Sequence, residues 1–360
     1  MRNRAAGGVL AALFAASAAL AQSGGGRGQV VLAGTDKDNS YKATILVSNE
    51  EEDAPTPADP LLRNGWGIAA GGTQGPWWVN DNDTNFSTLY TADGTKLSLE
   101  VAVPGGPTGI VFNGGSSFQL SDGVPALFIF DALDGSFSAW ASGNAATVVH
   151  SEAGAVYTGL AIHGDVLYAA DFAGCSVDAY HGNFFDNTFE EDDDINTRFQ
   201  DHSIPGGYCP FGIQAVGDSI FVTYAKVGED GDEEHGVGLG FVVEHDPDGN
   251  RIARVGSHGL LNAPWGLAMA PDNFGRFSNC LLVGNFGDGK INAFCKNPAG
   301  IWHHSGRLRE GAHGLTIDGL WGIGFGNGGA AGDTNVLYFA AGPDDEENGY
   351  YGKIEFAPKD

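Results

Sequence analysis

The sequence predicts an all-β fold built from six similar four-stranded units. The first observation is composition, because 57 of the 360 residues are glycine without a Gly-X-Y period and 42% of the residues are hydrophobic. This combination is typical of apolar strands joined by many turns. The second observation is a short element that recurs along the chain, and the third is the order of apolar runs that follows each copy.

The recurring element is an aromatic residue or Thr, followed by Gly and then by Ile or Leu. Successive glycines of its six copies are 42, 50, 53, 54 and 56 residues apart. These glycines are Gly67, Gly109, Gly159, Gly212, Gly266 and Gly322. The period is that of a β-propeller blade, in which the innermost strands crowd around an axis and leave little room for a side chain.

Each copy is followed by further runs that are rich in β-branched and aromatic residues, as strands are. The second strands are expected at 77–81, 127–131, 167–171, 220–224, 281–285 and 337–341, and a third strand follows each of them. Less regular fourth strands are expected at 97–103, 146–151, 199–204, 251–256 and 302–308. The prediction is therefore an all-β, six-bladed β-propeller of four-stranded antiparallel blades.

The sixth unit has no fourth strand of its own, because the sequence ends at Asp360. The run "KATILVSN" at 42–49 precedes the first unit and has the right length for a strand. We predict that this N-terminal strand pairs into the last blade and closes the ring. Closure removes the open sheet edges that would otherwise invite aggregation.

Residues 1–21 have the features of a secretory signal peptide. Arg2 and Arg4 precede a short Ala-rich apolar stretch, and Ala19-Leu20-Ala21 supplies a small-residue cleavage pattern. The predicted organisation is a signal peptide at 1–21, a flexible segment at 22–41 and the propeller domain at 42–360. We expect an exported protein, secreted or periplasmic, with no membrane-spanning segment.

Charge narrows the range of partners. The chain has 45 Asp and Glu against 18 Lys and Arg, a formal net charge of -27. Such a surface repels nucleic acid and anionic membranes, so the expected partner is a small molecule, a glycan or a protein ligand, bound by a monomer. Two acidic runs, at 190–194 and 229–234, are interpreted as solvated loops.

The segment "DNDTN" at 81–85 raises the possibility of a calcium loop. An EF-hand is excluded, because Phe86 stands where the sharp turn needs Gly and Ala92 where the bidentate Glu belongs. Asp81 is instead expected to end the second strand of the first blade, in register with Asp131, Asp171, Tyr224 and Asn285.

The block at 261–300 resembles an NHL-type repeat, with its "PWGLA" opening, "LLVGN" centre and "GKINAF" third strand. The region 44–358 resembles a family of exported, uncharacterised six-bladed propellers through blocks such as "NGWGIA", "IDGLWGIGFGNG" and "AGPDDEENG". More distantly it is similar to gluconolactonase-type and streptogramin-lyase-type propellers. The resemblance implies the fold and no established reaction, and no complete catalytic set of those enzymes can be matched here.

Four cysteines can pair in three ways. A two-residue turn at Gly287-Asp288 would place Cys280 directly opposite Cys295, whereas a turn at 288–289 would leave the two diagonal. Cys175 and Cys209 are expected on the same face of neighbouring blades. We predict the pairs Cys280–Cys295 and Cys175–Cys209; a zinc site is the alternative, but no CxxC occurs.

Alternating strand directions place the start of each first strand and the end of each second strand on one face of the ring. The candidate metal ligands there, suited to Ca²⁺, are Asp81, Asp131, Asp171, Asn285 and Asp318. The candidate ligand-binding residues are Asn64, Tyr157, Tyr224, Asn262, Asp344 and Asp345, and the acidic insert 229–235 is expected over the same rim. The alternative for each Asp or Asn is a bond to its own backbone in a turn.

Two functions fit this face. The first is an exported binding protein with a ligand or cation site, and the alternative is a Ca²⁺-dependent hydrolase or lyase of the lactonase or esterase kind. Trp66, Trp265 and Trp321 are interpreted as packing between blades rather than as a ligand cage. The sequence names no substrate.

Overall fold

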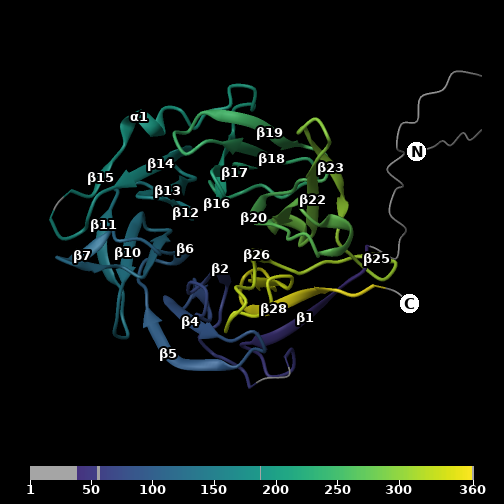
Figure 1. The fold of residues 1–360 in the computed structure, drawn as a ribbon, viewed down its shortest axis with the longest axis horizontal. Helices are drawn as coiled ribbons and strands as arrows, with labels where there is room; N and C mark the ends of the chain where they lie inside the picture. Colours follow the sequence, from purple (N-terminus) through teal and green to yellow (C-terminus); the bar gives the residue numbers. More distant parts are fainter. Residues whose placement is uncertain (1–38, 55–56, 187, 359–360) are drawn as a thin grey trace, which may run out of the picture. The chain divides into compact units, whose positions relative to one another are not determined.

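The computed structural model describes residues 39–54, 57–186 and 188–358, and these form a ring of six four-stranded antiparallel sheets (Figure 1). The predicted signal peptide and nearly all of the predicted flexible segment lie outside the described residues. None of the helices within those ranges is both long enough and apolar enough to cross a membrane.

Each blade takes its innermost strand from the recurring Gly element, and the sheet order then follows the chain outwards. Blade 1 consists of β2 (Gly65–Ala70), β3 (Trp77–Asp81), β4 (Phe86–Tyr90) and β5 (Lys96–Ala102). Blade 2 consists of β6 (Pro107–Phe112), β9 (Phe128–Ala132), β10 (Ser136–Trp140) and β11 (Thr147–Ser151). Blade 3 consists of β12 (Tyr157–His163), β13 (Val166–Asp171), β14 (Ser176–His181) and β15 (Glu190–Glu191).

The second half of the ring repeats this plan. Blade 4 consists of β16 (Tyr208–Val216), β17 (Ser219–Lys226), β18 (Gly240–His245) and β19 (Arg251–Ser257). Blade 5 consists of β20 (Pro264–Met269), β21 (Leu281–Asn285), β22 (Ile291–Lys296) and β23 (Trp302–Arg307). Blade 6 consists of β26 (Leu320–Phe325), β27 (Leu337–Ala341), β28 (Tyr350–Phe356) and β1 (Tyr41–Ser48).

Short elements decorate this ring. They are the hairpins β7 (Gln119–Ser121) with β8 (Val124–Pro125) and β24 (Arg309–Glu310) with β25 (His313–Gly314), the helix α1 (Asp193–Asn196), and two 3-10 turns, η2 (Gly275–Phe277) and η3 (Phe286–Asp288).

The predicted ring closure is confirmed. β1 pairs antiparallel with β28 from Tyr41 opposite Phe356 to Ser48 opposite Tyr350, and Figure 1 shows the purple N-terminal strand beside the yellow C-terminal one. The first strand of the described chain therefore covers an edge that β28 would otherwise expose.

The recurring glycines touch the next blade, as the sequence predicted. A Cβ atom added at Gly67 would lie 2.3 Å from the carbonyl oxygen of Thr108, and one at Gly212 would lie 2.3 Å from that of Trp265. Both distances are far shorter than a carbon–oxygen contact allows. Larger residues at these positions would force neighbouring blades apart.

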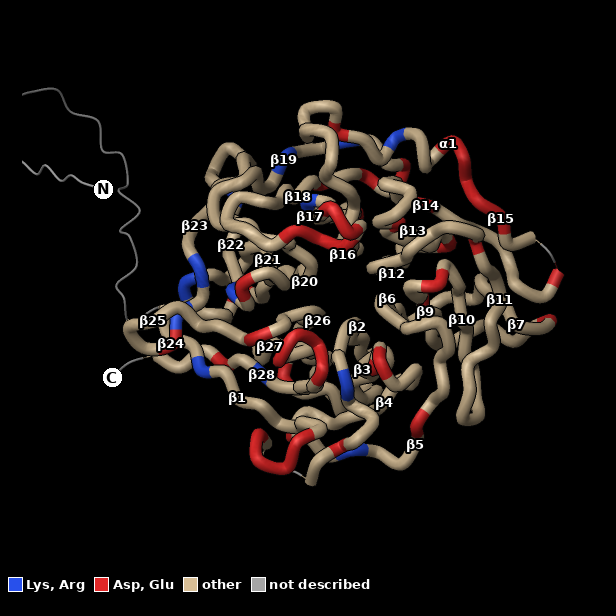
Figure 2. The backbone as a smooth tube through the Cα atoms, turned by 180° about the vertical axis from the view of Figure 1, so that it is seen from behind, with Lys and Arg blue, Asp and Glu red and all other residues tan. Residues whose placement is uncertain are grey.

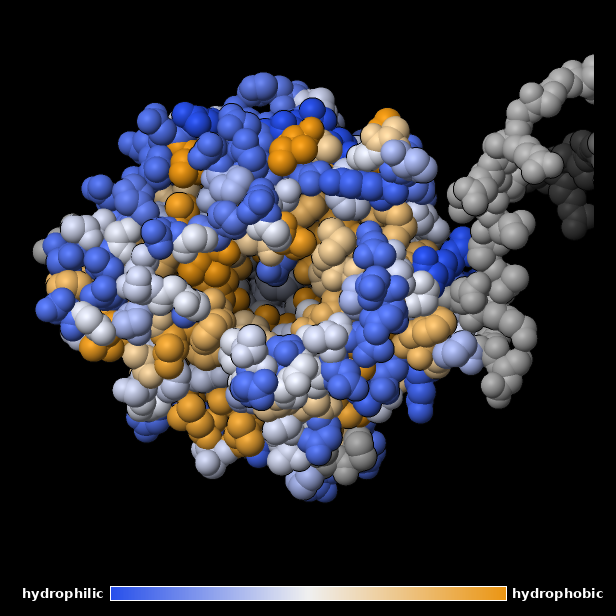
Figure 3. All heavy atoms as spheres, viewed as in Figure 1, coloured by the Kyte–Doolittle hydropathy of each residue, from blue (hydrophilic) through white to orange (hydrophobic). Residues whose placement is uncertain are grey.

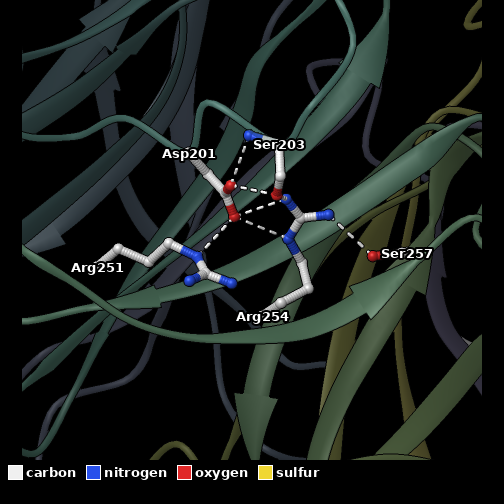
Figure 4. Close-up of polar contacts among 5 residues, drawn as sticks. All are labelled: Asp201, Ser203, Arg251, Arg254 and Ser257. Carbon is white, nitrogen blue, oxygen red and sulfur yellow. Dashed lines mark hydrogen bonds and ion pairs between the residues drawn. The ribbon is translucent and has the colours of Figure 1, made fainter.

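One strand prediction is wrong. The fourth strand of blade 3 is β15, whose residues face Tyr180 and His181 of β14, whereas 199–204 contains no strand. That segment belongs instead to blade 4, because Asp201 binds two arginines of β19 (Figure 4). The acidic run at 190–194 is correspondingly more ordered than a loop, since it forms β15 and begins α1.

Figure 4 shows how firmly this connection is held. The Asp201 carboxylate accepts hydrogen bonds from Arg251 Nε at 2.6 Å and from Arg254 Nε at 3.0 Å, and its other oxygen accepts from the Ser203 backbone and hydroxyl. Burial raises the pKa of Asp201, but the bonds from Ser203 and Arg254 outweigh burial and leave that pKa below its usual value. With a further hydrogen bond from Arg254 Nη2, five donors to one carboxylate group fix the chain between blades 3 and 4.

Both predicted disulfides are present, with Cα–Cα distances of 4.6 Å for Cys175–Cys209 and 4.4 Å for Cys280–Cys295. The register that places Cys280 opposite Cys295 is correct, since Leu281 faces Phe294. The turn type is different from the expected two-residue turn. The loop contains η3 and ends at Gly289 with φ 63°, and it is closed by a bond from Asn285 N to Lys290 O.

Candidate ligand-binding site at the ring axis

Aromatic side chains meet at the ring axis, on the face where the innermost strands begin. They come from the position before the recurring glycine in blades 1, 4, 5 and 6 and from the turn after β21. Trp66 stacks on Trp321 with ring centroids 3.7 Å apart, and Trp321 stacks on Phe286 at 3.8 Å. Trp265 meets Trp321 edge-on at 5.7 Å. The three tryptophans therefore pack against one another across the axis, and not only between adjacent blades.

A cavity of about 460 Å³ adjoins this aromatic cluster and is lined in part by its residues. Its walls include Trp66, Phe172, Phe211 and Trp321, all nine-tenths or more buried. Its rim carries four carboxylates, from Asp230, Asp232, Glu233 and Glu346. An aromatic wall below carboxylates gives this cavity both apolar area and negative charge.

A second hollow of about 310 Å³ adjoins the first and shares Glu233 and Glu346 with it. Asp288, Asp318 and Asp345 line this hollow together with His235 and Phe286. Neither set of lining residues contains a Lys or an Arg. The two cavities therefore form one strongly acidic mouth.

Two loops supply most of this charge, and both connect the second and third strands of a blade. Residues 227–239 follow β17 in blade 4, and 342–349 follow β27 in blade 6. Figure 2 shows the acidic parts of both loops reaching towards the centre of the ring from different sides. The expectation that 229–235 lies over this rim is confirmed by its place in the cavity lining.

The loop of blade 6 has an unusual backbone. Asp344, Asp345 and Glu346 have φ values of 58°, 54° and 68°, the left-handed region that costs L-residues roughly 1–2 kcal/mol each. Hydrogen bonds hold this turn, including one from the backbone N of Asp344 to Asp318 Oδ2 at 3.1 Å. The strained turn directs Glu346 towards the axis.

Asn64 ties Glu346 to the aromatic stack. Its Nδ2 donates to Glu346 Oε1 at 2.9 Å, and its Oδ1 accepts from Trp321 Nε1 at 3.1 Å. Burial is the main reason that the pKa of Glu346 is raised, with the nearby charge of Glu233 adding to it. The pKa of His235 is also raised, first through its hydrogen bond to Glu233.

The structure brings five of the predicted residues to this mouth. Asp318 and Asp345 line the smaller hollow, and Asp344 and Asn64 hold the loop that carries Glu346. Asn262 fixes the other acidic loop by accepting a hydrogen bond from Gly236 N at 2.7 Å. The sequence did not identify Glu346, Glu233 or the aromatic walls as site residues. The aromatic residue before several of the recurring glycines was a signal that could have pointed to the tryptophans.

Asp131 is not in the register that the sequence predicted. Asp81, Asp171, Tyr224 and Asn285 each face the residue two positions before the recurring glycine of their blade, and in blade 2 this place belongs to Ala132. A shift of one residue turns a side chain to the opposite sheet face. Asp131 therefore lies on the other face of its sheet from those residues. It is fully buried there and accepts hydrogen bonds from Thr108 Oγ1 at 2.8 Å and Gly109 N at 2.5 Å.

The remaining predicted residues line neither cavity. Asp81 is completely buried, and burial holds its pKa well above the usual value. Asp171 accepts a hydrogen bond from Val156 N, and Asn285 donates to Leu260 O and Asp288. Tyr157 and Tyr224 lie in apolar clusters on either side of blade 3.

The five predicted calcium ligands are thus not gathered around one point. Among the described residues, no three His, Cys, Asp or Glu side chains are placed to hold one metal ion together. The acidic mouth nevertheless presents carboxylates, the oxygen ligands that Ca²⁺ accepts.

The opposite face differs in character. Its cavity, of about 400 Å³, is lined largely by apolar residues from the ends of the innermost strands, such as Ile68, Ile110, Phe112 and Met269. Figure 3 shows apolar side chains around the central opening on this face. None of the residues that line this cavity is charged, in contrast to the acidic mouth.

With this geometry established, comparisons with known proteins are informative. Two uncharacterized proteins of Acanthamoeba polyphaga mimivirus are each 30% identical to this chain, over 336 and 353 residues. Each match covers 88% of this chain. The matches cover 80% of the first viral protein and 86% of the second. The chain belongs to the same family as these viral proteins. No family model matches the sequence.

The fold is shared with a solved structure, and a second one is similar to a lesser degree. The soluble aldose sugar dehydrogenase of Escherichia coli, in its apo form, is 13% identical and has a TM-score of 0.50, with 89% of this chain and 100% of that chain covered. A gluconolactonase from Xanthomonas campestris is 17% identical with a TM-score of 0.48, over 85% of this chain and 90% of that chain. At these identities the likeness is one of fold alone.

Proposed function

We propose that this family member is an exported β-propeller that binds a small ligand at the acidic mouth of its axis. The observation that carries the proposal is the cavity of about 460 Å³ with aromatic walls beneath two carboxylate-bearing loops. Its volume lies within the range of about 300–1,000 Å³ that small-molecule sites occupy. The two disulfides are compatible with an oxidising, extracytoplasmic compartment.

The chemistry of the walls supports binding. The aromatic side chains of Trp66, Phe172 and Phe211 offer apolar contact area, and the carboxylates of the lining can orient a polar or charged group. The strain of the loop at 344–346 is a further indication, because unfavourable backbone conformations persist where the surrounding structure enforces them and often mark ligand clamps.

A Ca²⁺-dependent hydrolase or lyase at the same mouth is the alternative. Such an enzyme needs several oxygen ligands around one ion and an open position for water. Metal analysis of the purified protein and turnover of a panel of lactones and esters test this alternative directly. A bound stoichiometric metal whose removal abolishes turnover would replace the binding proposal with the enzymatic one.

The binding proposal is tested by blocking the cavity. Ala173 is exposed and lines the cavity, so Ala173→Trp should fill it without disturbing the core. Ala312→Trp places the same side chain at an exposed position of the remote β24–β25 turn as a control. Binding of amines, sugars, lactones and carboxylates is measured by tryptophan fluorescence and calorimetry. Loss of binding in Ala173→Trp alone supports the site, and equal binding by both variants contradicts it.

A further inference from the structure

We propose that the ligand of this mouth is an organic cation with a compact alkylammonium group. This inference rests on the proposed function and adds the chemical class of the ligand. It follows from three features of the mouth: its one-sided charge, its aromatic walls and the way in which Glu346 is held above them.

The charge of the mouth is not balanced by the protein. Four carboxylates rim the larger cavity and three more line the smaller one, while the lining residues include no Lys or Arg. Nearby, Lys290 bonds to Asp288 at 2.9 Å and His235 lies 3.3 Å from Glu233, so two of the seven have a basic neighbour. Gathering the others without a counterion is unfavourable, and a positively charged ligand would relieve that cost.

The walls distinguish an organic cation from a bare metal ion. Ca²⁺ requires six to eight oxygen ligands, whereas four aromatic residues are among those that line this cavity. Ring faces attract an ammonium group by about 0.5–2 kcal/mol, with Trp the strongest. Trp321 lies between Trp66 and Phe286 in the stack. The stack therefore ends with Trp66 at the larger cavity and Phe286 at the smaller one.

A polar group in the wall is also left without a partner. Trp66 is only 6% exposed, and its Nε1 makes no hydrogen bond to any described residue. The corresponding atoms of Trp265 and Trp321 donate to Thr158 O and Asn64 Oδ1. The indole N–H of Trp66 is thus an unsatisfied buried donor on a residue that lines the cavity.

Glu346 is positioned where an ammonium group above Trp66 would need a counter-charge. Its carboxylate is fixed by Asn64, which also binds Trp321, so the charge and the aromatic stack are joined by one side chain. The left-handed turn at 344–346 maintains this placement at an energetic cost. An anionic ligand would meet repulsion here, and a neutral one would leave the carboxylates unpaired.

The proposal is tested with choline and its neutral isostere 3,3-dimethylbutan-1-ol, which have the same shape and differ in charge. Isothermal titration at low ionic strength should show choline binding at least about tenfold more tightly than the alcohol. Glu346→Gln keeps an acceptor for Asn64 and should weaken choline binding about tenfold. Glu347→Gln, an exposed neighbour that lines neither cavity, is the matched control and should leave the affinity unchanged.

Further results distinguish an organic cation from a neutral ligand and from an inorganic cation. Should Glu346→Gln fail to fold, Glu233→Gln provides a second test, because Glu233 lines both cavities. Equal binding of choline and the alcohol, with both lost in Ala173→Trp, overturns the cation class and leaves the proposed function intact. Binding unaffected by Ala173→Trp overturns both. Displacement of choline by CaCl₂ beyond that caused by NaCl of equal ionic strength would assign the mouth to an inorganic cation and overturn this inference.

Discussion

The buried carboxyl group of Asp131 makes a sharp prediction about stability and pH. Burial raises the pKa of Asp131 to about 7, although hydrogen bonds from Thr108 and Gly109 act in the opposite direction. One carboxyl oxygen has no hydrogen-bond partner among the described residues. In the unfolded chain the pKa of an Asp is about 3.9. The folded protein therefore binds one proton more than the unfolded chain between about pH 4 and pH 7.

The sign and size of the effect follow from linkage. Because the folded state holds the extra proton, the free energy of unfolding falls as pH rises through this window, by about 1.4 kcal/mol per pH unit. About three units of difference give a total loss of about 4 kcal/mol, complete above pH 7. Asp131→Asn removes the titration. It also copies blade 1, where Asn80 occupies the equivalent place and donates to Thr108 O and Gly109 O.

Urea unfolding at pH 4 to 8, with the disulfides intact, measures this difference. Asp131→Asn should match the wild type near pH 4 and be more stable by up to about 4 kcal/mol at pH 8. Asp218→Asn removes the same charge at an exposed turn and controls for net charge. A variant-to-wild-type difference that is the same at pH 4 and pH 8 would refute the reasoning, because it would mean that Asp131 titrates alike in both states.

Three further predictions concern the scaffold. Asp201→Asn should lower the free energy of unfolding, measured by urea titration, by about 2 kcal/mol at pH 7. Because the pKa of Asp201 is depressed in the folded state, this difference should shrink as the pH falls below about 4. Replacing Cys280 and Cys295 together by Ser should cost about 3 kcal/mol by calorimetry, from the 15-residue separation. Deleting residues 41–48 should expose the edge of β28 and yield aggregates in size-exclusion chromatography, whereas a monodisperse product would contradict their role in closure.

The fold was accessible from sequence because its signals are periodic. The spacing of Gly67 and its counterparts gave the number of blades, and the apolar run at 42–49 gave the closing strand. Cys280 and Cys295 could be paired because an antiparallel hairpin fixes opposing residues. Each of these inferences used only strand alternation and short turns, which local sequence determines.

The predictions from sequence were wrong where contacts between distant segments determine the position of a strand. The apolar run at 127–131 suggested that Asp131 ends its strand in register, but Leu127 is 40% exposed and precedes β9, so the strand lies one residue later. The segment 199–204 begins and ends with an apolar residue, Phe199 and Ile204, and this suggested a strand. The ion pairs of Asp201 with arginines about fifty residues away nevertheless draw that segment onto blade 4.

The candidate site was likewise predictable only in part. Its face could be predicted, because the starts of inner strands and the ends of second strands meet there. Its lining could not, because the position of Glu346 depends on three consecutive left-handed residues and on Asn64, 282 residues earlier in the chain. No periodic pattern specifies such a turn.

The most direct test of the axial site is the response of the tryptophan indole N–H signals to choline, recorded by ¹H–¹⁵N NMR on the purified protein. Of the seven tryptophans, Trp66 and Trp321 line the larger cavity. Trp140 and Trp302 belong to apolar clusters between blades 1 and 2 and between blades 4 and 5. The account predicts saturable shifts of the Trp66 and Trp321 signals and none for Trp140 or Trp302. Binding that shifts Trp140 or Trp302 and leaves the axial pair unmoved would contradict it.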